Sequence, residues 1–310
     1  MHIIYHHRTA GDRVERVHIM GMVRALRRFG HTVEISSPPG CDPEKESTDE
    51  KPKQSDGCLR SLLKCFARKA PDILFEVGEV LYNFYCVFDL LRRARRRKPD
   101  LIYERFTANS LAPTLLARHW DVPVVQEINV TTDIGRLRPL AMGGVSRFIE
   151  RWVTEKSTLL VTVSEEFQRL LLKKGFPTNR LLACHNAIDP DCFDPRSVEP
   201  VPKPDYLGSN TVTIGYVGAF VPYHNLDTLV RAADRIHKDH KTTWILVGDG
   251  VEKPHIESLI NEYNLAGDFW LPGRVNHEWV PRFVRTMDVA VLPNSETFNS
   301  PMKLFEYMAM

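Results

Sequence analysis

The sequence has no apolar run close to the ~20 residues that a membrane-spanning helix needs, and its first residues lack the apolar stretch of a secretory signal. Its six cysteines form no C-x-x-C pair and show no repeated spacing, which argues against a disulfide framework. The formal net charge is only +2, so no overall electrostatic field favours nucleic acid. We therefore expect a cytoplasmic protein with free thiols and no nucleic-acid partner.

Two widespread nucleotide-binding motifs are also missing. No G-x-G-x-x-G fingerprint follows the first strand pattern, and no Walker pattern occurs. Nicotinamide-dependent reductases or epimerases and P-loop enzymes are therefore disfavoured. The segment Asp189-Pro-Asp191 is a nominal D-x-D metal motif, but both residue types favour a turn, so we expect no bound metal.

Short apolar strands alternate with helical patterns along the whole chain. A helix whose apolar residues repeat at helical spacing lies between the first two expected strands and ends at Gly30. Strands are expected at residues 3–5, 31–36, 100–103, 123–128, 159–163, 211–217, 243–247, 268–271 and 289–292. This alternation is typical of doubly wound α/β domains.

A proline-rich stretch without periodicity divides this pattern in two. We predict two tandem Rossmann-like domains facing a cleft, residues 1–196 and 211–310, joined by a linker at 197–210. Residues 39–57 contain no large apolar side chain and are predicted to be a mobile insertion. Ligands of open α/β sheets bind at the carboxyl ends of the strands, so the loops at those ends are the candidate sites.

Residues 59–98 are predicted to be mostly helical and end in the basic run Arg92–Lys98. One interpretation is a solvated helix end, where cations complement the C-terminal dipole. The alternative is attraction to anionic lipid, which would give peripheral contact with the inner face of the membrane.

The last sixteen residues carry the strongest functional signal. A strand pattern leads into a polar turn, and a helix is expected to open at Ser300-Pro301. Such an opening offers free backbone N–H groups and a positive dipole end to an anion. Lys303 adds charge for a phosphate, and Glu306, three residues later, can accept hydrogen bonds from a ribose diol. Together they predict a nucleotide-sugar site.

Several segments, taken in order, resemble family 4 glycosyltransferases of the two-domain GT-B type. The resemblance covers nearly the whole chain, and in the first half it is looser, through short segments that include Tyr103-Glu-Arg105 and Glu127-Ile-Asn129. The segments of the second half that carry it are Asn186–Phe193, Tyr216–Leu229, Leu246–Gly250, Leu271–Val275 and Ser300–Ala309, the last matching a subgroup with an S-P-x-K-L-F-E-Y ending.

This resemblance implies transfer of a hexose or related sugar from a nucleotide-diphosphate sugar to a glycan, lipid-linked or other acceptor. Retention at the anomeric carbon, no metal and no cofactor besides the donor substrate are implied as well. Glu306 would bind the ribose and Val275 would meet the base through its backbone. Gly218, the loop around His224 and the helix opening at Ser300 would hold the diphosphate, where Lys303 and a protonated His224 could offset the charge of the leaving group.

In the first domain the resemblance places Asn129 close to the reacting sugar. Asn can donate a hydrogen bond but cannot act as an acid or base near pH 7, and a turn residue at a strand end is the plainer interpretation. Gly11 and Asp12, on the first loop, would approach the acceptor or a phosphate. We expect Arg105 and Glu127 to form a structural pair.

Departures from the family pattern keep a second hypothesis open. Ala219, His224 and Phe298 stand where the family usually has Arg, Lys and Glu. The alternative is therefore a non-catalytic or fragmentary GT-B chain that binds a nucleotide or a protein partner. The family would continue beyond Met310, so we expect a C-terminally truncated second domain and an inactive, poorly soluble chain. Apolar surface should then be exposed on Val289–Leu292 and on Leu304, Phe305 and Met308.

Overall fold

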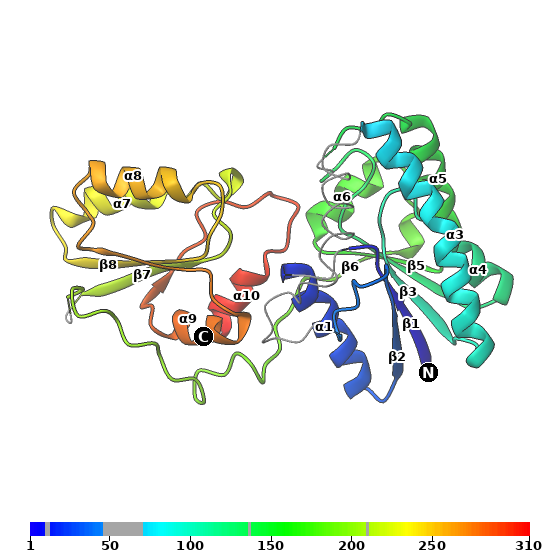
Figure 1. Cartoon of the computed structure of the whole chain (residues 1–310), viewed down its shortest axis with the longest axis horizontal. Helices are drawn as coiled ribbons and strands as arrows, with labels where there is room; N and C mark the ends of the chain where they lie inside the picture. Colours follow the sequence, from blue (N-terminus) through cyan, green and yellow to red (C-terminus); the bar gives the residue numbers. More distant parts are fainter. Residues whose placement is uncertain (10–12, 46–70, 136–137, 209–210) are drawn as a thin grey trace. The chain divides into compact units, whose positions relative to one another are not determined.

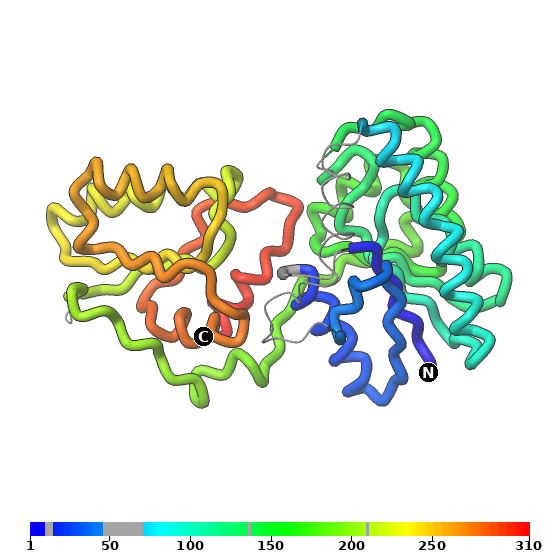
Figure 2. Tube along the Cα trace, viewed as in Figure 1, coloured from blue at the N-terminus to red at the C-terminus, as the bar shows by residue number. Residues whose placement is uncertain are grey.

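The computed structural model describes residues 1–9, 13–45, 71–135, 138–208 and 211–310. These residues form two compact units, Met1–Cys184 and His185–Met310 (Figures 1 and 2). Gly11, Asp12, residues 46–57 of the expected insertion and residues 59–70 of the expected helical segment lie outside the described ranges. Residues 39–45 form turns apart from two irregular residues.

The first unit is a parallel sheet covered by helices on both faces. Within its described residues the strand order is β2-β1-β3-β4-β5-β6, so the order reverses between β1 and β3. Its elements are β1 (His2–His6), α1 (Arg13–Arg28), β2 (Thr32–Ser36), α3 (Asp72–Arg96), β3 (Leu101–Arg105), α4 (Ala112–Trp120), β4 (Val124–Ile128), α5 (Gly143–Lys156), β5 (Leu159–Thr162), α6 (Glu165–Lys173), η1 (Thr178–Arg180) and β6 (Leu181–Ala183).

The inner strand β1, which lies between β2 and β3, explains why both faces are covered. All five of its residues are buried, because successive side chains point to opposite faces and each face has its own helix layer. Ile3 and Tyr5 pack with Ile19 and Val23 of α1, and Ile4 packs with Leu90 of α3. Burial of every residue therefore marks β1 as an inner strand of the sheet.

The second unit repeats this plan with the order β10-β7-β8-β9, all parallel. In Figure 1, α7 and α8 lie on one side of its sheet, and α9 and α10 lie on the other. Its elements are β7 (Val212–Val217), η2 (Pro222–His224), α7 (Asp227–His237), β8 (Thr242–Val247), α8 (Lys253–Glu262), β9 (Phe269–Gly273), η3 (His277–Trp279), α9 (Val280–Arg285), β10 (Val289–Ala290) and α10 (Met302–Ala309).

The expected strands are all present, with boundaries that differ by a few residues. Strand β6 was not expected, because three residues carry too little periodicity to predict a strand. Residues 185–196, assigned from the sequence to the first domain, group with the second unit. Phe193 packs there with Val217 and Ile245 in one apolar cluster.

The apolar surface expected near the end of the chain is partly present. Val289, Leu304 and Met308 are exposed, whereas Phe305 and Leu292 are half-buried. None of the described helices combines the length and the apolar character that crossing a membrane requires.

Candidate functional site

The candidate site of the second unit lies where its strand order reverses, between β7 and β10. Ligands of open α/β sheets bind at the carboxyl edge beside such a reversal. The chain leaves β7 into the loop that starts at Gly218, and leaves β10 into the loop that leads to α10. The sequence segments predicted to hold the diphosphate therefore meet at one edge of the sheet.

Lys303, in the first turn of α10, reaches back to the end of β7. Its Nζ donates to the Tyr216 hydroxyl at 3.0 Å and lies 3.1 Å from Nε2 of His224. The ammonium also lies 4.7 Å from the centre of the Tyr216 ring. Two side chains, Tyr216 of β7 and His224 of η2, thus hold the partly buried Lys303 ammonium at the carboxyl edge.

The hydrogen bonds of His224 assign its protonation. Its Nδ1 lies 2.7 Å from the carbonyl of Ala219, which can only accept, so Nδ1 carries the proton and Nε2 accepts from Lys303. Burial, and then the charge of Lys303, lower the pKa of His224. The protonated His224 expected from the sequence is therefore disfavoured. In the unliganded chain His224 is a neutral acceptor that orients Lys303.

Burial also lowers the pKa of Lys303, to about 8, although Glu306 acts in the opposite direction. The ammonium is therefore charged at neutral pH but only partly compensated by anions. Its neighbours Tyr216 and His224 offer neutral oxygen and nitrogen atoms. An arriving phosphate would supply the negative charge that this site lacks.

Gly218 is required by the same contacts. A Cβ on this residue would lie 2.5 Å from the Tyr216 hydroxyl and 2.7 Å from Nζ of Lys303. Gly248, at the end of β8, has φ +145°, and a Cβ there would meet the Gly218 carbonyl. The two glycines therefore let the loops approach each other and the lysine closely.

Glu306 lies one turn further along α10 and is buried. Its Oε1 is 3.1 Å from Nε2 of His277, a residue that the sequence did not single out. The next residue, Tyr307, accepts a bond from the Val217 N–H at 2.8 Å and so ties α10 to the end of β7. Val275 packs against the apolar cluster that contains Val217.

Ser300 precedes α10, which begins at Met302 with Pro301 at its cap position. The Ser300 hydroxyl accepts from the Asn186 backbone N–H at 3.0 Å, and its carbonyl accepts from the Asn186 side-chain amide at 2.6 Å. Asn186 therefore fixes the approach to the helix. In the sequence, the one indication of a role for Asn186 is its place at the start of the segment 186–193 that carries the family resemblance.

The first unit gathers its polar residues around Glu127, at the end of β4. This buried carboxylate accepts hydrogen bonds from His18, Arg105, Asn129 and Tyr103 at 2.9, 2.9, 2.6 and 3.1 Å. Burial alone would raise the pKa of Glu127, but the His18 hydrogen bond and the Arg105 charge outweigh it and hold the pKa at about 2.

The expected pair between Arg105 and Glu127 is confirmed. The amide of Asn129 is bound to the same carboxylate, which fixes its orientation at the strand end but leaves its predicted role near the reacting sugar untested. His7, directly after β1, is buried with no partner for Nε2 among the described residues, and burial lowers its pKa to about 4.

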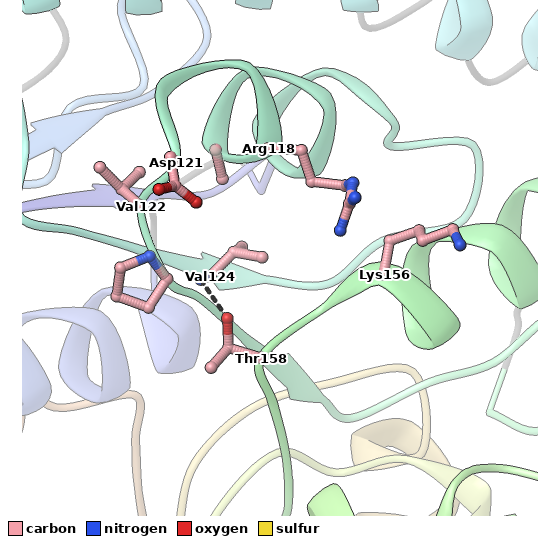
Figure 3. A pocket seen from close by; sticks show the side chains of 8 residues that line it. Arg118, Asp121, Val122, Val124, Lys156 and Thr158 are labelled. Carbon is pink, nitrogen blue, oxygen red and sulfur yellow. Dashed lines mark hydrogen bonds between the residues drawn. The ribbon is translucent and has the colours of Figure 1, made fainter.

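A shallow depression of about 300 Å³ lies at the other edge of the first sheet, beside the start of β4 (Figure 3). Arg118 and Lys156 line it, and each lies in the last turn of its helix. Cations at helix C-termini complement the helix dipole, so these side chains need no ligand to explain them.

Comparison with known proteins identifies the class of molecule. Residues 16–192 match the family described as Glycosyltransferase Family 4, and residues 211–310 match Glycosyl transferases group 1. The first match alone spans more than half of the chain. This chain belongs to Glycosyltransferase Family 4.

The curated relatives of this family 4 chain are distant. It is 24% identical over 151 residues to the 2-deoxystreptamine glucosyltransferase of Streptomyces kanamyceticus, covering 47% of this chain and 39% of that protein. It is 24% identical over 213 residues to the D-inositol 3-phosphate glycosyltransferase of Mycobacteroides abscessus, covering 64% of this chain and 47% of that protein. The chain thus spans about half the length of the curated relatives it matches.

Solved structures confirm the fold. A glycosyltransferase from Rickettsia africae gives a TM-score of 0.67 at 14% identity, covering 100% of this chain and 77% of that one. HepE from Anabaena, solved in complex with UDP, gives a TM-score of 0.60 at 13% identity, covering 100% of this chain and 78% of that one. The predicted GT-B class with two Rossmann-like units is therefore confirmed.

The nominal metal motif of this family 4 chain is a turn. The Asp191 N–H donates to Oδ1 of Asp189 at 3.3 Å, and residues 190–192 are turn residues. Across the ranges that the structure describes, no three His, Cys, Asp or Glu side chains lie together in a way that could hold a metal ion.

Proposed function

We propose that this family 4 chain transfers a hexosyl or related residue from a nucleotide-diphosphate sugar to a glycan, a lipid-linked or another acceptor. Retention at the anomeric carbon and independence of a metal and of any cofactor belong to the proposal. The observation that carries it is the partly buried Lys303 ammonium, held by Tyr216 and His224 at the reversal of strand order. We place the reaction in the cytoplasm.

The donor would lie across the carboxyl edge of the second sheet. Lys303, Gly218, His224 and the first free N–H groups of α10 would contact the diphosphate. His224 would contact the diphosphate as a neutral side chain that stays hydrogen-bonded to Lys303. When Glu306 accepts hydrogen bonds from the ribose hydroxyls, it would either give up its contact with His277 or keep that contact as well. HepE binds UDP, so UDP is the first nucleotide to test.

The chemistry proposed for these residues is electrostatic. When the bond between the anomeric carbon and the diphosphate breaks, negative charge grows on the phosphate oxygens. A fixed cation in a partly buried site stabilises that charge more than it stabilises the bound donor. The acceptor hydroxyl forms the new bond on the same face of the sugar, and its proton leaves with the diphosphate. Asn129 would hold the sugar by hydrogen bonding alone, because an amide does not titrate near pH 7.

A donor screen tests the proposal. The chain is incubated with UDP- and GDP-sugars, and release of the nucleoside diphosphate is measured with and without glycan and lipid-linked acceptors. Binding of UDP without any turnover would instead favour the alternative of a non-catalytic or fragmentary chain, which Ala219, His224 and Phe298 motivate and for which the sequence predicted inactivity. Absence of both binding and turnover would contradict both hypotheses.

Replacing Glu306 with alanine should weaken binding of a nucleotide sugar by about 1–3 kcal/mol, because a hydrogen bond to a charged group is lost. Calorimetric titration of the native chain and the variant with UDP and with deoxy-UDP measures this change in affinity. If Glu306 binds the ribose, the substitution should weaken binding of deoxy-UDP much less than binding of UDP. Glu296→Ala is the matched control, since Glu296 is exposed on the preceding loop. Equal affinities for Glu306→Ala and the control would exclude the ribose role.

Transfer should persist in excess chelator. The described residues offer no cluster of metal ligands, and the Asp189–Asp191 segment is a turn. Nucleoside diphosphate release is measured with EDTA and again after adding Mg²⁺ or Mn²⁺. Loss of activity with EDTA and recovery with either ion would refute metal independence.

A further inference from the structure

The outward face of α3 is apolar over five turns. Leu74, Val77, Leu81, Phe84, Phe88 and Leu91 are all exposed and recur at spacings of three and four residues, which places them along one side of the helix. Phe84 and Phe88 are 73% and 66% exposed. We call these six residues the apolar ridge. Figure 1 shows α3 as the long cyan helix beside α4.

The inward face of the same helix carries the charges. The three charged residues between Ile73 and Leu91 are Glu76, Glu79 and Asp89, and each has partners within the first unit. Glu76 accepts from the backbone N–H groups of Ala141 and Met142 at 2.5 and 2.8 Å. Asp89 accepts from Ser36 at 2.8 Å and from Arg93 at 2.7 Å.

These contacts fix the rotation of α3 about its axis. Turning the ridge toward the sheet would expose the apolar core residue Leu90 and leave the buried carboxylates without their donors. In the part of the first unit that the structure describes, these contacts therefore keep the ridge on the surface. Exposed contiguous apolar surface of this kind marks a site of interaction with a protein or a membrane.

A basic cluster continues from the C-terminal end of the ridge. Arg95, Arg96, Arg97 and Lys98 are exposed. Arg92 is exposed as well, and its guanidinium lies 3.6 Å from Asp89. No exposed charged residue interrupts the ridge before this cluster. The surface is thus an uncharged apolar strip with one strongly cationic end.

Charge decides between the occupants that such a strip could take. A second copy in parallel would place two cationic ends side by side. Among the residues that the structure describes at the start of α3, an antiparallel copy would offer the cluster Asp72, which already lies 3.8 Å from Arg138. An anionic lipid surface matches both parts, because the ridge can pack against acyl chains and the basic cluster can pair with lipid phosphates.

We propose that α3 docks this chain on anionic lipid bilayers, lying in the plane of the interface. The ridge from Leu74 to Leu91 would run about 26 Å along the surface at 1.5 Å per residue. It would enter the boundary between headgroups and acyl chains, with the basic cluster at the level of the phosphates. The proposal concerns a different surface from the donor site and does not depend on catalysis.

Vesicle flotation tests the proposal without confusing binding with aggregation. The 310-residue chain is mixed with phosphatidylcholine vesicles that contain or lack phosphatidylglycerol, and lipid-bound protein is collected at the top of a density gradient. We expect flotation with the anionic vesicles, little with pure phosphatidylcholine, and a severalfold loss at 0.5 M salt.

Variants assign the binding to its two parts. Phe84→Ser with Phe88→Ser should reduce flotation at least tenfold, whereas Phe29→Ser, at an exposed phenylalanine of the α1 end, should not. Arg95→Glu with Arg96→Glu should also reduce flotation at least tenfold. The control, Arg235→Glu with Lys238→Glu in the second unit, should not reduce it. Circular dichroism checks that each variant is folded.

Two results would overturn the proposal. One is an equal reduction of flotation in the Phe84 and Phe88 variant and in the Phe29 control. The other is absence of flotation together with a concentration-dependent dimer that dissociates in the Phe84 and Phe88 variant, which would assign the ridge to a second copy. UDP titration of the same samples shows whether the donor site is intact in either case.

Discussion

Lys303→Met is expected to lower the rate of glycosyl transfer by about 10²–10³-fold, the usual effect of removing one fixed donor from a site of developing negative charge. Methionine keeps most of the side-chain volume against the Tyr216 ring, so the unfolding temperature should change little. Initial rates of nucleoside diphosphate release and a thermal unfolding scan measure the two effects on the same sample.

Lys203→Met is the matched control for Lys303. Its Nζ bonds the Thr213 hydroxyl at 3.2 Å, near the start of β7 rather than at its end. The control should transfer at the native rate. Full activity in Lys303→Met would remove the lysine from the donor site, and equal losses in both variants would point to a structural effect.

The pH dependence of donor binding gives a second readout of the same lysine. The pKa of Lys303 is lowered to about 8, so the free chain loses this charge as pH rises through that value. Binding of UDP should therefore weaken between pH 7 and pH 9 in the native chain. In Lys303→Met this decline should be absent, because no ammonium remains to titrate.

The sequence predicted which segments of the second unit come together better than it predicted the contacts between them. The order of strands and helices, together with the turn before Ser300, indicated that the loops after β7 and β10 meet at the carboxyl edge of the second sheet. The partners of Lys303 could not be predicted in this way. Tyr216 and His224 lie 87 and 79 residues away from it, and only the folded sheet brings them to one point.

The protonation of His224 illustrates what a motif leaves out. A histidine at a family position for lysine suggested a second cation. Its neutral state follows from burial and from a carbonyl at 2.7 Å, neither of which has a sequence signature. The structure thereby reduces the predicted pair of cations to one.

Helix α3 shows a different limit. Helical periodicity normally indicates which face is buried, because apolar residues turn inward. In α3 the carboxylates of Glu76 and Asp89 turn inward, since backbone N–H groups, Ser36 and Arg93 satisfy them there. The burial of a charged residue depends on partners that are distant in sequence, so the orientation of this helix required the structure.

Glu127→Ala is expected to lower the free energy of unfolding of the first unit by about 3–5 kcal/mol, because it removes one partner of a buried ion pair. Arg105 and the Tyr103 hydroxyl would lose the carboxylate that they share. Glu127→Gln keeps an acceptor oxygen but not the charge, and should lie between the native chain and the alanine variant. Urea-induced unfolding at pH 7 measures all three.

The pH dependence separates the charge of Glu127 from its packing. Its pKa is about 2 in the folded chain and about 4.3 when unfolded, so the carboxylate stabilises the fold fully above pH 4.3 and progressively less as pH falls through 2. The difference between the native chain and Glu127→Gln should therefore shrink as the pH is lowered across this range. Glu155→Ala, which removes an exposed carboxylate paired with Arg151, should leave the unfolding free energy nearly unchanged. Similar small losses for Glu127→Ala and Glu155→Ala would mean that the donors around Glu127 are satisfied without it, and the cluster would then be a surface network rather than the buried centre of the first unit.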